Sequence, residues 1–478
     1  RLLPQKPSRW AKILLNRKVP ILLFFLLELA FLVFSYLSLQ EHFPSIILWE
    51  HLLSVFTFFY LLNRSMDSRS KLSWMIIIAL FPIFGTALLY FSLADLGVRR
   101  LKKRLEDATV QVSDYLSTDP EVADYLSQSD RQLQKLAYFL EHSPAQFPIY
   151  RDTEVTYFPL GDDMLPALLE DLKKAESYIF MEYFIIDEGE MWGEILAILK
   201  QKVQEGMEVR VLYDGMIEFS TLSFDYKKRL ERIGIQSRVF ASVTPFLSTY
   251  YNYRDHRKIL LIDGKVAFTG GVNLADEYIN KIERFGHWKD TALMVEGPAV
   301  DTFLVLFLQM WTYSHETLDV TPYMVEHEAF QMWSVTEKEL VVEPYLVEHE
   351  KSRRANGYVI PYGDSPLDID KIGENVYIDI LNHARDFVHI MTPYLILDGE
   401  LLHALKFAAE RGVDVSIIMP GIPDKKSAYY LAKTYYPTLL ASGVKIYEYT
   451  PGFVHAKVFV SDNSRAVVGT INLDYRSL

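Results

Sequence analysis

The pattern of hydrophobic and polar positions divides the chain into two regions of different character. The first 98 residues carry three long apolar runs, Pro20–Leu39, Ile46–Leu62 and Trp74–Phe91. A helix of about 20 apolar residues is long enough to cross a bilayer. A cleaved signal peptide is the alternative for the first run, but no small-residue cleavage site follows it. We therefore predict an N-terminal helical membrane anchor over residues 1–98.

Basic residues beside these runs suggest how the anchor is arranged. Six Lys and Arg precede the first run, none lies in 40–45, three lie in 63–71 and five in 99–104. The excess of basic residues in cytoplasmic loops places all three basic flanks on the cytoplasmic side. Two spans followed by a re-entrant or interfacial third segment, broken at Pro82 and Gly85, satisfy this rule. Three simple spans with one flank that violates the rule remain the alternative. In either case we expect a multi-pass protein of the cell membrane, with the part of the chain after the anchor on the cytoplasmic side.

The pattern changes after the anchor. Residues 99–145 are charged and helical in pattern, which predicts a connector. From 146 onward, short β-branched or aromatic runs alternate with amphipathic stretches, the pattern of an α/β fold. We predict two α/β domains there, over 146–345 and 346–478.

Composition narrows the possible partners. The 478 residues include no Cys, so disulfides and thiolate metal sites are excluded. The net charge is −13, but residues 1–104 hold 14 Lys and Arg against 5 Asp and Glu. The remainder, with 35 basic and 57 acidic residues, has a net charge of −22. Such an acidic body argues against nucleic acid as a partner, whereas a basic, apolar N-terminal part favours the membrane.

An internal repeat carries the candidate chemistry. The stretch from His256 to Asp263, HRKILLID, has a counterpart in HAKVFVSD from His455 to Asp462. Each H-x-K-x4-D stretch is followed at the same spacing by a Gly and an Asn, and the offset is 199 throughout. Side chains two residues apart on a strand point to the same face, so each His is presented together with a Lys. Chance does not readily supply two such motifs at matching places in a duplicated domain.

Residues of these types suit a phosphate diester. If the two halves face each other, two His, two Lys and two Asn meet in one site. One imidazole can attack phosphorus while the other protonates the departing alkoxide. The non-bridging oxygens can be held by four fixed donors, which we expect to replace a metal ion. These donors are Lys258, Asn273, Lys457 and Asn472.

Other readings of the motif residues are weaker or remain open. A metal site lacks carboxylates at ligand spacing that both halves share, and a Ser-His-Asp site lacks a nucleophile elbow, so we expect no metal or cofactor. Asp263 and Asp462 each sit where a strand turns into a hairpin. We include both among the candidate catalytic residues but interpret them mainly as ordering the turn. The motif glycines either let the backbone approach the phosphate or allow tight strand packing.

At these residues the sequence resembles the phospholipase D superfamily and, within it, the bacterial cardiolipin synthases. The resemblance extends over the segment SWMIIIALFPIFGTALLYF, the entry RDHRK to the first motif, PGIPDKK from Pro420, and the run from Gly452 through GTINLDYRS. It implies two duplicated phospholipase D-like α/β domains related by a pseudo-twofold axis. It also implies a membrane-bound transfer between two phosphatidylglycerol molecules that yields cardiolipin and glycerol. By this resemblance His256 attacks to form a phosphatidyl-enzyme, and His455 protonates the departing glycerol and then activates the second phosphatidylglycerol.

The resemblance also implies a carboxylate that orients a catalytic histidine. In the family an acidic residue at the position of Asp290 serves this purpose, so we assign that role to Asp290. Capping of a strand is its alternative role. In relatives the second half continues to an Asn-Phe-Glu whose glutamate is the equivalent, whereas this sequence stops at Leu478 and begins at Arg1 without Met. We therefore expect the protein to continue at both ends.

Other functions are compatible with similar residues. A phospholipase D-type hydrolase, or a transferase to another alcohol, would have the same site and admit a different second acceptor. A nuclease of the superfamily would need a basic groove, and the net charge of −22 argues against one. A non-enzymatic scaffold would tolerate loss of one motif, whereas both motifs are intact here. Four tyrosines either line the lipid-facing cleft that a site for phospholipid transfer needs or pack in the core: Tyr429, Tyr430, Tyr435 and Tyr436. Oligomeric state is not predicted.

Overall fold

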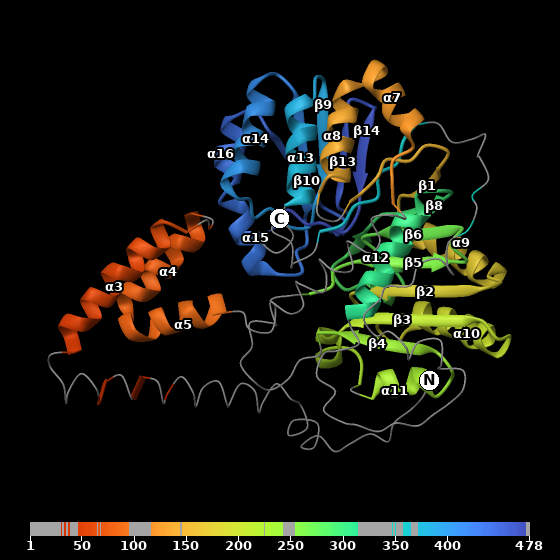
Figure 1. Cartoon of the computed structure of the whole chain (residues 1–478), viewed down its shortest axis with the longest axis horizontal. Helices are drawn as coiled ribbons and strands as arrows, with labels where there is room; N and C mark the ends of the chain where they lie inside the picture. Colours follow the sequence, from red (N-terminus) through yellow and green to blue (C-terminus); the bar gives the residue numbers. More distant parts are fainter. Residues whose placement is uncertain are drawn as a thin grey trace. The chain divides into compact units, whose positions relative to one another are not determined.

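The computed structural model describes residues 30, 33–34, 37–38, 46–64, 66, 68–94, 116–143, 146–223, 225–241, 254–313, 347, 349, 357–364 and 371–474. The chain divides into two compact units. One comprises Arg1–Arg100 with Thr244–Asn252, and the other Leu101–Val243 with Tyr253–Leu478. Figure 1 shows both along the chain.

The first unit is helical where it is described. It contains α3 (Ile46–Leu62), α4 (Ser68–Leu80) and α5 (Pro82–Ala94). Leu61, Ile78 and Leu89, one from each helix, are fully buried together. Most of the predicted run 20–39 lies outside the described residues.

The third apolar run is broken into two helices, as predicted at Pro82. Pro82 begins α5, because proline has no N–H to continue α4 and its fixed φ suits a first helical position. Gly85 does not break the helix but lies within α5, where a Cβ would come 2.9 Å from the Cα of Ile78. Among the described residues, every helix is too short or too polar to cross a membrane. The expected spans therefore stay a prediction.

The second unit begins with two helices in the predicted connector. These are α7 (Pro120–Ser129) and α8 (Arg131–Glu141), each started by an aspartate whose side chain accepts backbone N–H groups of the first turn. Val122, Leu126, Ala137 and Ile149 form a small core with the partly buried side chains of Tyr358 and Ile360. The remaining connector residues, 99–115 and 144–145, lie outside the described part.

The first half of this unit is built on a seven-stranded mixed sheet of order β1-β8-β6-β5-β2-β3-β4. Strands β2, β3 and β4 are parallel, and the other pairings are antiparallel. The strands are β1 (Glu154–Phe158), β2 (Tyr178–Tyr183), β3 (Glu208–Asp214), β4 (Gln236–Phe240), β5 (Lys258–Ile262), β6 (Val266–Gly270) and β8 (Ala292–Glu296). The helices are α9 (Gly161–Lys174), α10 (Glu190–Gln204), α11 (Tyr226–Glu231) and α12 (Val300–Tyr313), with short turns η1 (Gly215–Phe219) and η3 (Asp276–Ile279).

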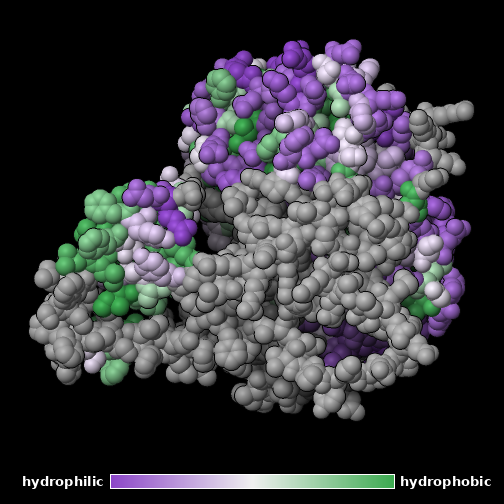
Figure 2. Space-filling view, viewed as in Figure 1, coloured by the Kyte–Doolittle hydropathy of each residue, from purple (hydrophilic) through white to green (hydrophobic). Residues whose placement is uncertain are grey.

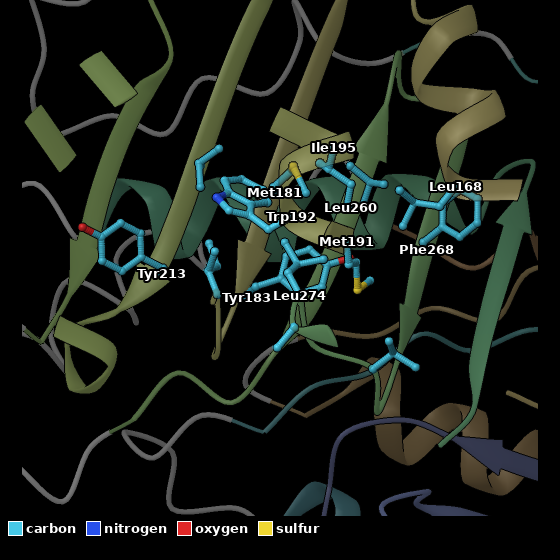
Figure 3. Packing of buried hydrophobic residues seen from close by; sticks show 14 of the residues in the cluster. Leu168, Met181, Tyr183, Met191, Trp192, Ile195, Tyr213, Leu260, Phe268 and Leu274 are labelled. Carbon is cyan, nitrogen blue, oxygen red and sulfur yellow. The ribbon is translucent and has the colours of Figure 1, made fainter. Parts of the chain in front are cut away.

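Every residue of β2 is buried, because helices cover the sheet on both faces. Figure 3 shows one side, where Met181 and Leu260 of the sheet lie with Trp192 and Ile195 of α10. On the other side the rings of Phe180 and Phe307 stack at 4.9 Å between β2 and α12. The alternation of apolar runs and amphipathic stretches had predicted this layered α/β arrangement.

The second half has a five-stranded sheet of order β11-β10-β9-β13-β14. This order corresponds to β4-β3-β2-β5-β6 of the first half, with the same pattern of parallel and antiparallel pairs. The strands are β9 (Phe387–Met391), β10 (Asp414–Pro420), β11 (Lys445–Tyr449), β13 (Val458–Ser461) and β14 (Arg465–Val468). The helices are α13 (Ile372–His383), α14 (Gly399–Glu410), α15 (Lys426–Lys433) and α16 (Tyr436–Ala441).

A short two-stranded sheet joins the halves. β7 (His287–Lys289) of the first half pairs in parallel with β12 (Gly452–Val454) of the second. Gly286 permits this approach: its φ is +68°, and a Cβ there would come 2.4 Å from the carbonyl oxygen of Pro451. The pairing brings the residue after β7 next to the residue after β12, which are Asp290 and His455.

Candidate active site

The first motif enters the sheet through a loop held by buried carboxylates. Asp214, at the end of β3, accepts a hydrogen bond from the backbone N–H of Asp255 at 3.0 Å and is fully buried. His256 follows, and Lys258 begins β5. The ammonium of Lys258 donates to the carbonyl oxygen of His256 at 2.5 Å. The strand start therefore presents the imidazole and the ammonium together, as the spacing predicts.

The second motif is fixed by the joint between the halves. The backbone N–H groups of His455 and Ala456 both donate to the carbonyl oxygen of Lys289, at 2.8 and 3.2 Å. The ammonium of Lys457 donates to the carbonyl oxygen of His455, and its Nζ lies 2.9 Å from Nδ1 of the same ring. His455 is therefore anchored on the first half as well as on its own strand.

Asp290 contacts the histidine of the opposite half. Its Oδ2 lies 2.6 Å from Nδ1 of His455, and its side chain is fully buried. Its Oδ1 accepts the N–H of Thr291 at 2.9 Å. A Cβ on Gly271 would come 1.9 Å from that Oδ1, so only glycine leaves room for the carboxylate. With a proton on Nδ1 the ring donates to Asp290 and keeps Nε2 for a reacting group.

His256 is held differently. Its Nδ1 lies 3.0 Å from the carbonyl oxygen of Thr470, which belongs to the second half. The ring lies 5.0 Å from that of Phe184. A proton on Nδ1 would be donated to this carbonyl, again leaving Nε2 with its lone pair.

The electrostatics tie the four basic groups of the two motifs into one site. Burial, then Lys258, Lys457 and His455, hold the pKa of His256 well below its ordinary value. Burial and Lys457 lower the pKa of His455 to about 4, although Asp290 opposes the shift. Groups from both halves thus lie within electrostatic reach of each other.

Burial and neighbouring charges also set the pKa values of the two lysines and of Asp290. Burial and Lys457 hold the pKa of Lys258 well below its ordinary value. Burial lowers the pKa of Lys457 to about 8, against the pull of Asp290. Burial raises the pKa of Asp290, but His455 and Lys457 more than offset this, and the net pKa is lowered. Four groups that become cationic on protonation, with one carboxylate among them, favour an anionic ligand.

The two predicted asparagines differ in their surroundings. Asn273 is buried and already engaged: Oδ1 accepts the N–H of Ile185 at 3.0 Å, and Nδ2 donates to the hydroxyl of Tyr278 at 2.8 Å. Asn472 is also buried, and its Oδ1 has no hydrogen-bond partner among the described residues. Asn273 therefore supports the end of β2, whereas Asn472 keeps hydrogen-bonding capacity.

The structure does not bring Asp263 and Asp462 to the histidines. β5 separates Asp263 from Lys258 by roughly 17 Å of extended chain. The carboxylate of Asp263 accepts three backbone N–H groups, from residues 176–178, at 2.7 to 2.9 Å. Asp462 does the same with residues 385–387 at 2.8 to 2.9 Å. Both are turn-ordering residues with positive φ, as the hairpin position suggested.

Sequence reasoning missed several contributors to the site. Thr470 contributes its backbone carbonyl to His256, and no side-chain pattern marks such a contact in a sequence. Asp214 lies far from the motif in sequence and had no local pattern to mark it. Tyr278, whose ring meets His455 edge-on at 5.4 Å, likewise had none.

A carboxylate cluster away from these histidines is occupied by a lysine. Glu374, Asp398 and Glu400 lie close enough to share a cation among the described residues. The ammonium of Lys371 lies 2.6 Å from Glu374 Oε2 and 3.3 Å from Asp398 Oδ2. The cluster therefore has its cation within the chain.

Comparison with known proteins assigns the family. The family model described as cardiolipin synthase, PLD-like domain, matches residues 168–311 and 377–478. That described as phospholipase D-nuclease N-terminal matches residues 52–92. The first match contains both histidine motifs and Asp290.

Relatives agree with this assignment. "Cardiolipin synthase 2" of Bacillus anthracis is 34% identical over 87% of this chain and 77% of its own length. A Streptococcus mutans protein described as uncharacterized is 58% identical over 88% of this chain and 86% of its own. Among solved structures, phosphatidylserine synthase of Haemophilus influenzae covers 73% of this chain and 84% of its own at 15% identity and a TM-score of 0.49, too distant to bear on the assignment. By the family model and the curated relatives, the chain belongs to the bacterial cardiolipin synthases of the phospholipase D superfamily, enzymes that transfer phospholipid groups.

Proposed function

We propose that this protein condenses two phosphatidylglycerol molecules into cardiolipin and glycerol, through a covalent phosphatidyl group on His256. The observation that carries the proposal is the constellation across the two halves. His256 and Lys258 come from one motif, His455 and Lys457 from the other, and Asp290 contacts the histidine of the opposite half. Membership of the cardiolipin synthases supports a phospholipid substrate.

In the first step, Nε2 of His256 attacks the phosphorus of one phosphatidylglycerol. The N–P bond forms as the bond from phosphorus to the head-group glycerol oxygen breaks. The bound phosphodiester anion, together with Asp290, raises the pKa of His455 above its value of about 4 in the free protein, so the ring enters this step protonated on both nitrogens. His455 then gives its Nε2 proton to that oxygen, and glycerol leaves as the neutral alcohol. The low pKa of His256, caused first by burial, supports an attacking ring that is unprotonated at neutral pH.

In the second step, a head-group hydroxyl of another phosphatidylglycerol replaces the histidine. His455, left neutral by the first step, takes the hydroxyl proton as the oxygen attacks phosphorus. The new P–O bond forms, the N–P bond breaks, and His256 is regenerated. Asp290 stabilises His455 whenever it is charged, as a carboxylate does for a catalytic imidazolium.

The lysines hold the non-bridging phosphate oxygens in this proposal. Burial lowers both pKa values in the free protein, and the charge of Lys457 lowers that of Lys258 further. A phosphodiester anion opposes these shifts, so its binding raises both pKa values and favours the ammonium forms. Asn472 is the better asparagine for the same task, with Nδ2 as the donor, because the amide of Asn273 is engaged by Ile185 and Tyr278.

We also propose that the first unit attaches the protein to the cell membrane, with the catalytic unit on the cytoplasmic side. Figure 2 shows a hydrophobic surface over the helices of this unit. Large apolar side chains of these helices are exposed, among them Phe56 (72%), Phe59 (61%) and Leu80 (66%). Exposed apolar area of this kind fits contact with lipid.

The test is to supply the purified protein with phosphatidylglycerol labelled in both the phosphatidyl and glycerol parts. The proposal predicts one cardiolipin and one free glycerol for every two phosphatidylglycerol molecules consumed. Phosphatidic acid in place of cardiolipin would identify a hydrolase. A new phosphatidyl alcohol, formed only when another alcohol is added, would identify a different acceptor.

A further inference from the structure

The segment of residues 421–433 borders the candidate site. The N–H groups of Gly421 and Ile422 both donate to the carbonyl oxygen of Gly452, at 3.1 Å, in the strand that leads to His455. The carboxylate of Asp424 accepts a hydrogen bond from the hydroxyl of Tyr394 at 2.7 Å. Its charge also reaches the ammonium of Lys457. The segment thus adjoins the groups proposed to act on phosphate.

The outer side of the segment is apolar. Ile422 is 41% exposed, Tyr430 66% and Leu431 40%, the last two on α15 (Figure 1). Tyr435, just beyond α15, is buried and donates its hydroxyl to the Leu397 carbonyl at 3.0 Å. The tyrosine-rich stretch therefore divides between core and surface. Large apolar side chains exposed together beside a reaction site mark a place of contact.

The segment is also basic within an otherwise acidic body, and Lys426 lies one helical turn before Tyr430 on α15, so these two side chains share a face. Lys425 and Lys426 are exposed and form no ion pair with the residues that the structure describes. Lys433 pairs with Glu448 at 3.4 Å. Asp424 is the one acidic residue of this stretch, whereas residues 105–478 together carry a net charge of −22. Exposed apolar side chains among lysines are complementary to an anionic lipid surface.

We propose that residues 421–433 form a lipid-docking surface that seats the second half on a bilayer rich in anionic lipid and admits phosphatidylglycerol to the site. This rests on the proposed function, because it names how that substrate is reached. Ile422, Tyr430 and Leu431 enter the boundary between head groups and acyl chains. Lys425 and Lys426 contact the lipid phosphates.

The direct test uses the absence of native cysteine. A single Tyr430→Cys variant of the full chain is labelled with an environment-sensitive fluorophore and mixed with phosphatidylglycerol vesicles that carry a quencher in the acyl region. We expect strong quenching. The matched control is Glu410→Cys, an exposed position at the other end of the second half, about 20 Å away along β10. Equal quenching at both positions would overturn the proposal. Burial of the label at position 430 in the absence of lipid, increasing with protein concentration, would also overturn it, because that result would indicate contact with a second copy of the chain.

A kinetic test separates docking from chemistry. Lys426→Glu combined with Tyr430→Ala should raise the apparent KM for vesicle phosphatidylglycerol about tenfold, since each basic side chain near an anionic surface contributes appreciably to binding. The double variant should turn over a monomeric short-chain phosphatidylglycerol at the wild-type rate. The matched control, Lys200→Glu at an exposed lysine on α10, should also keep wild-type turnover. An equal loss on monomeric substrate would overturn the proposal. The quenching test needs no turnover, so it stands even if the product is not cardiolipin.

Discussion

Asp290→Asn is the substitution that most sharply probes how the two halves cooperate. It keeps the size of the side chain but removes the charge that lies 2.6 Å from Nδ1 of His455. The side chain is fully buried, so water cannot replace the lost charge. The new amide takes the space that Gly271 leaves for the carboxylate. His455 therefore loses the partner that opposes the lowering of its pKa.

The expected loss follows from the geometry. Two unit charges about 3 Å apart attract by about 5 kcal/mol at an effective dielectric constant of about 20. Part of this attraction is retained in Asp290→Asn, because the amide oxygen can still accept a hydrogen bond from the ring. Each 1.4 kcal/mol is a factor of ten in rate, so we expect kcat to fall about 10³-fold. The KM for phosphatidylglycerol should change little, because Asp290 acts through His455.

The assay is steady-state formation of cardiolipin, with thermal unfolding measured on the same samples. The matched control is Asp462→Asn, which removes a carboxylate that accepts three backbone N–H groups away from the histidines. That variant should unfold at a lower temperature but keep near-normal kcat in its folded fraction. Asp290→Asn with more than a tenth of wild-type kcat, or a control with the same loss of kcat, would refute the reasoning.

The remaining predictions concern space, protonation and topology. Gly271→Ala should lower kcat at least 10²-fold, because its Cβ would overlap Oδ1 of Asp290 at 1.9 Å; normal kinetics would contradict this. The pKa of His455 is lowered to about 4 from an ordinary 6.5, so the unfolded chain binds its proton first as pH falls. About 3 kcal/mol of stability should be lost between pH 6.5 and 4, and His455→Ala should show a shallower dependence in melting experiments. Ser117→Cys, an exposed position of the catalytic unit, should resist an impermeant thiol reagent in intact cells; labelling from outside would reject a cytoplasmic site.

The repeat made much of the fold predictable, together with the pairs of residues that each motif brings to the candidate site. A motif that recurs at a constant offset of 199 implies that the two halves share strands and turns, and their sheets do share a strand order. The turn-ordering role of Asp263 could be inferred because a hairpin position is a local property. The break at Pro82 could be inferred for the same reason.

Contacts between the halves could not be read from the sequence. The approach of Asp290 to His455 depends on pairing of two three-residue strands, β7 and β12, more than 160 positions apart. Such short strands have no periodicity of their own. Asn273 was predicted to bind phosphate because it repeats, but burial between Ile185 and Tyr278 gives its amide other partners.

The central claim, that His256 carries the phosphatidyl group between two lipids, can be tested by trapping that group. Phosphatidylglycerol labelled in its phosphatidyl part is mixed with the protein, stopped within one turnover in alkaline denaturant that preserves N–P bonds, and the labelled peptide is identified. We expect label on His256 in the wild type and none in His256→Ala. Where the second step is the slower, Asp290→Asn should carry more label than the wild type. Label on His455 instead, or rapid formation of cardiolipin with no labelled peptide, would contradict it.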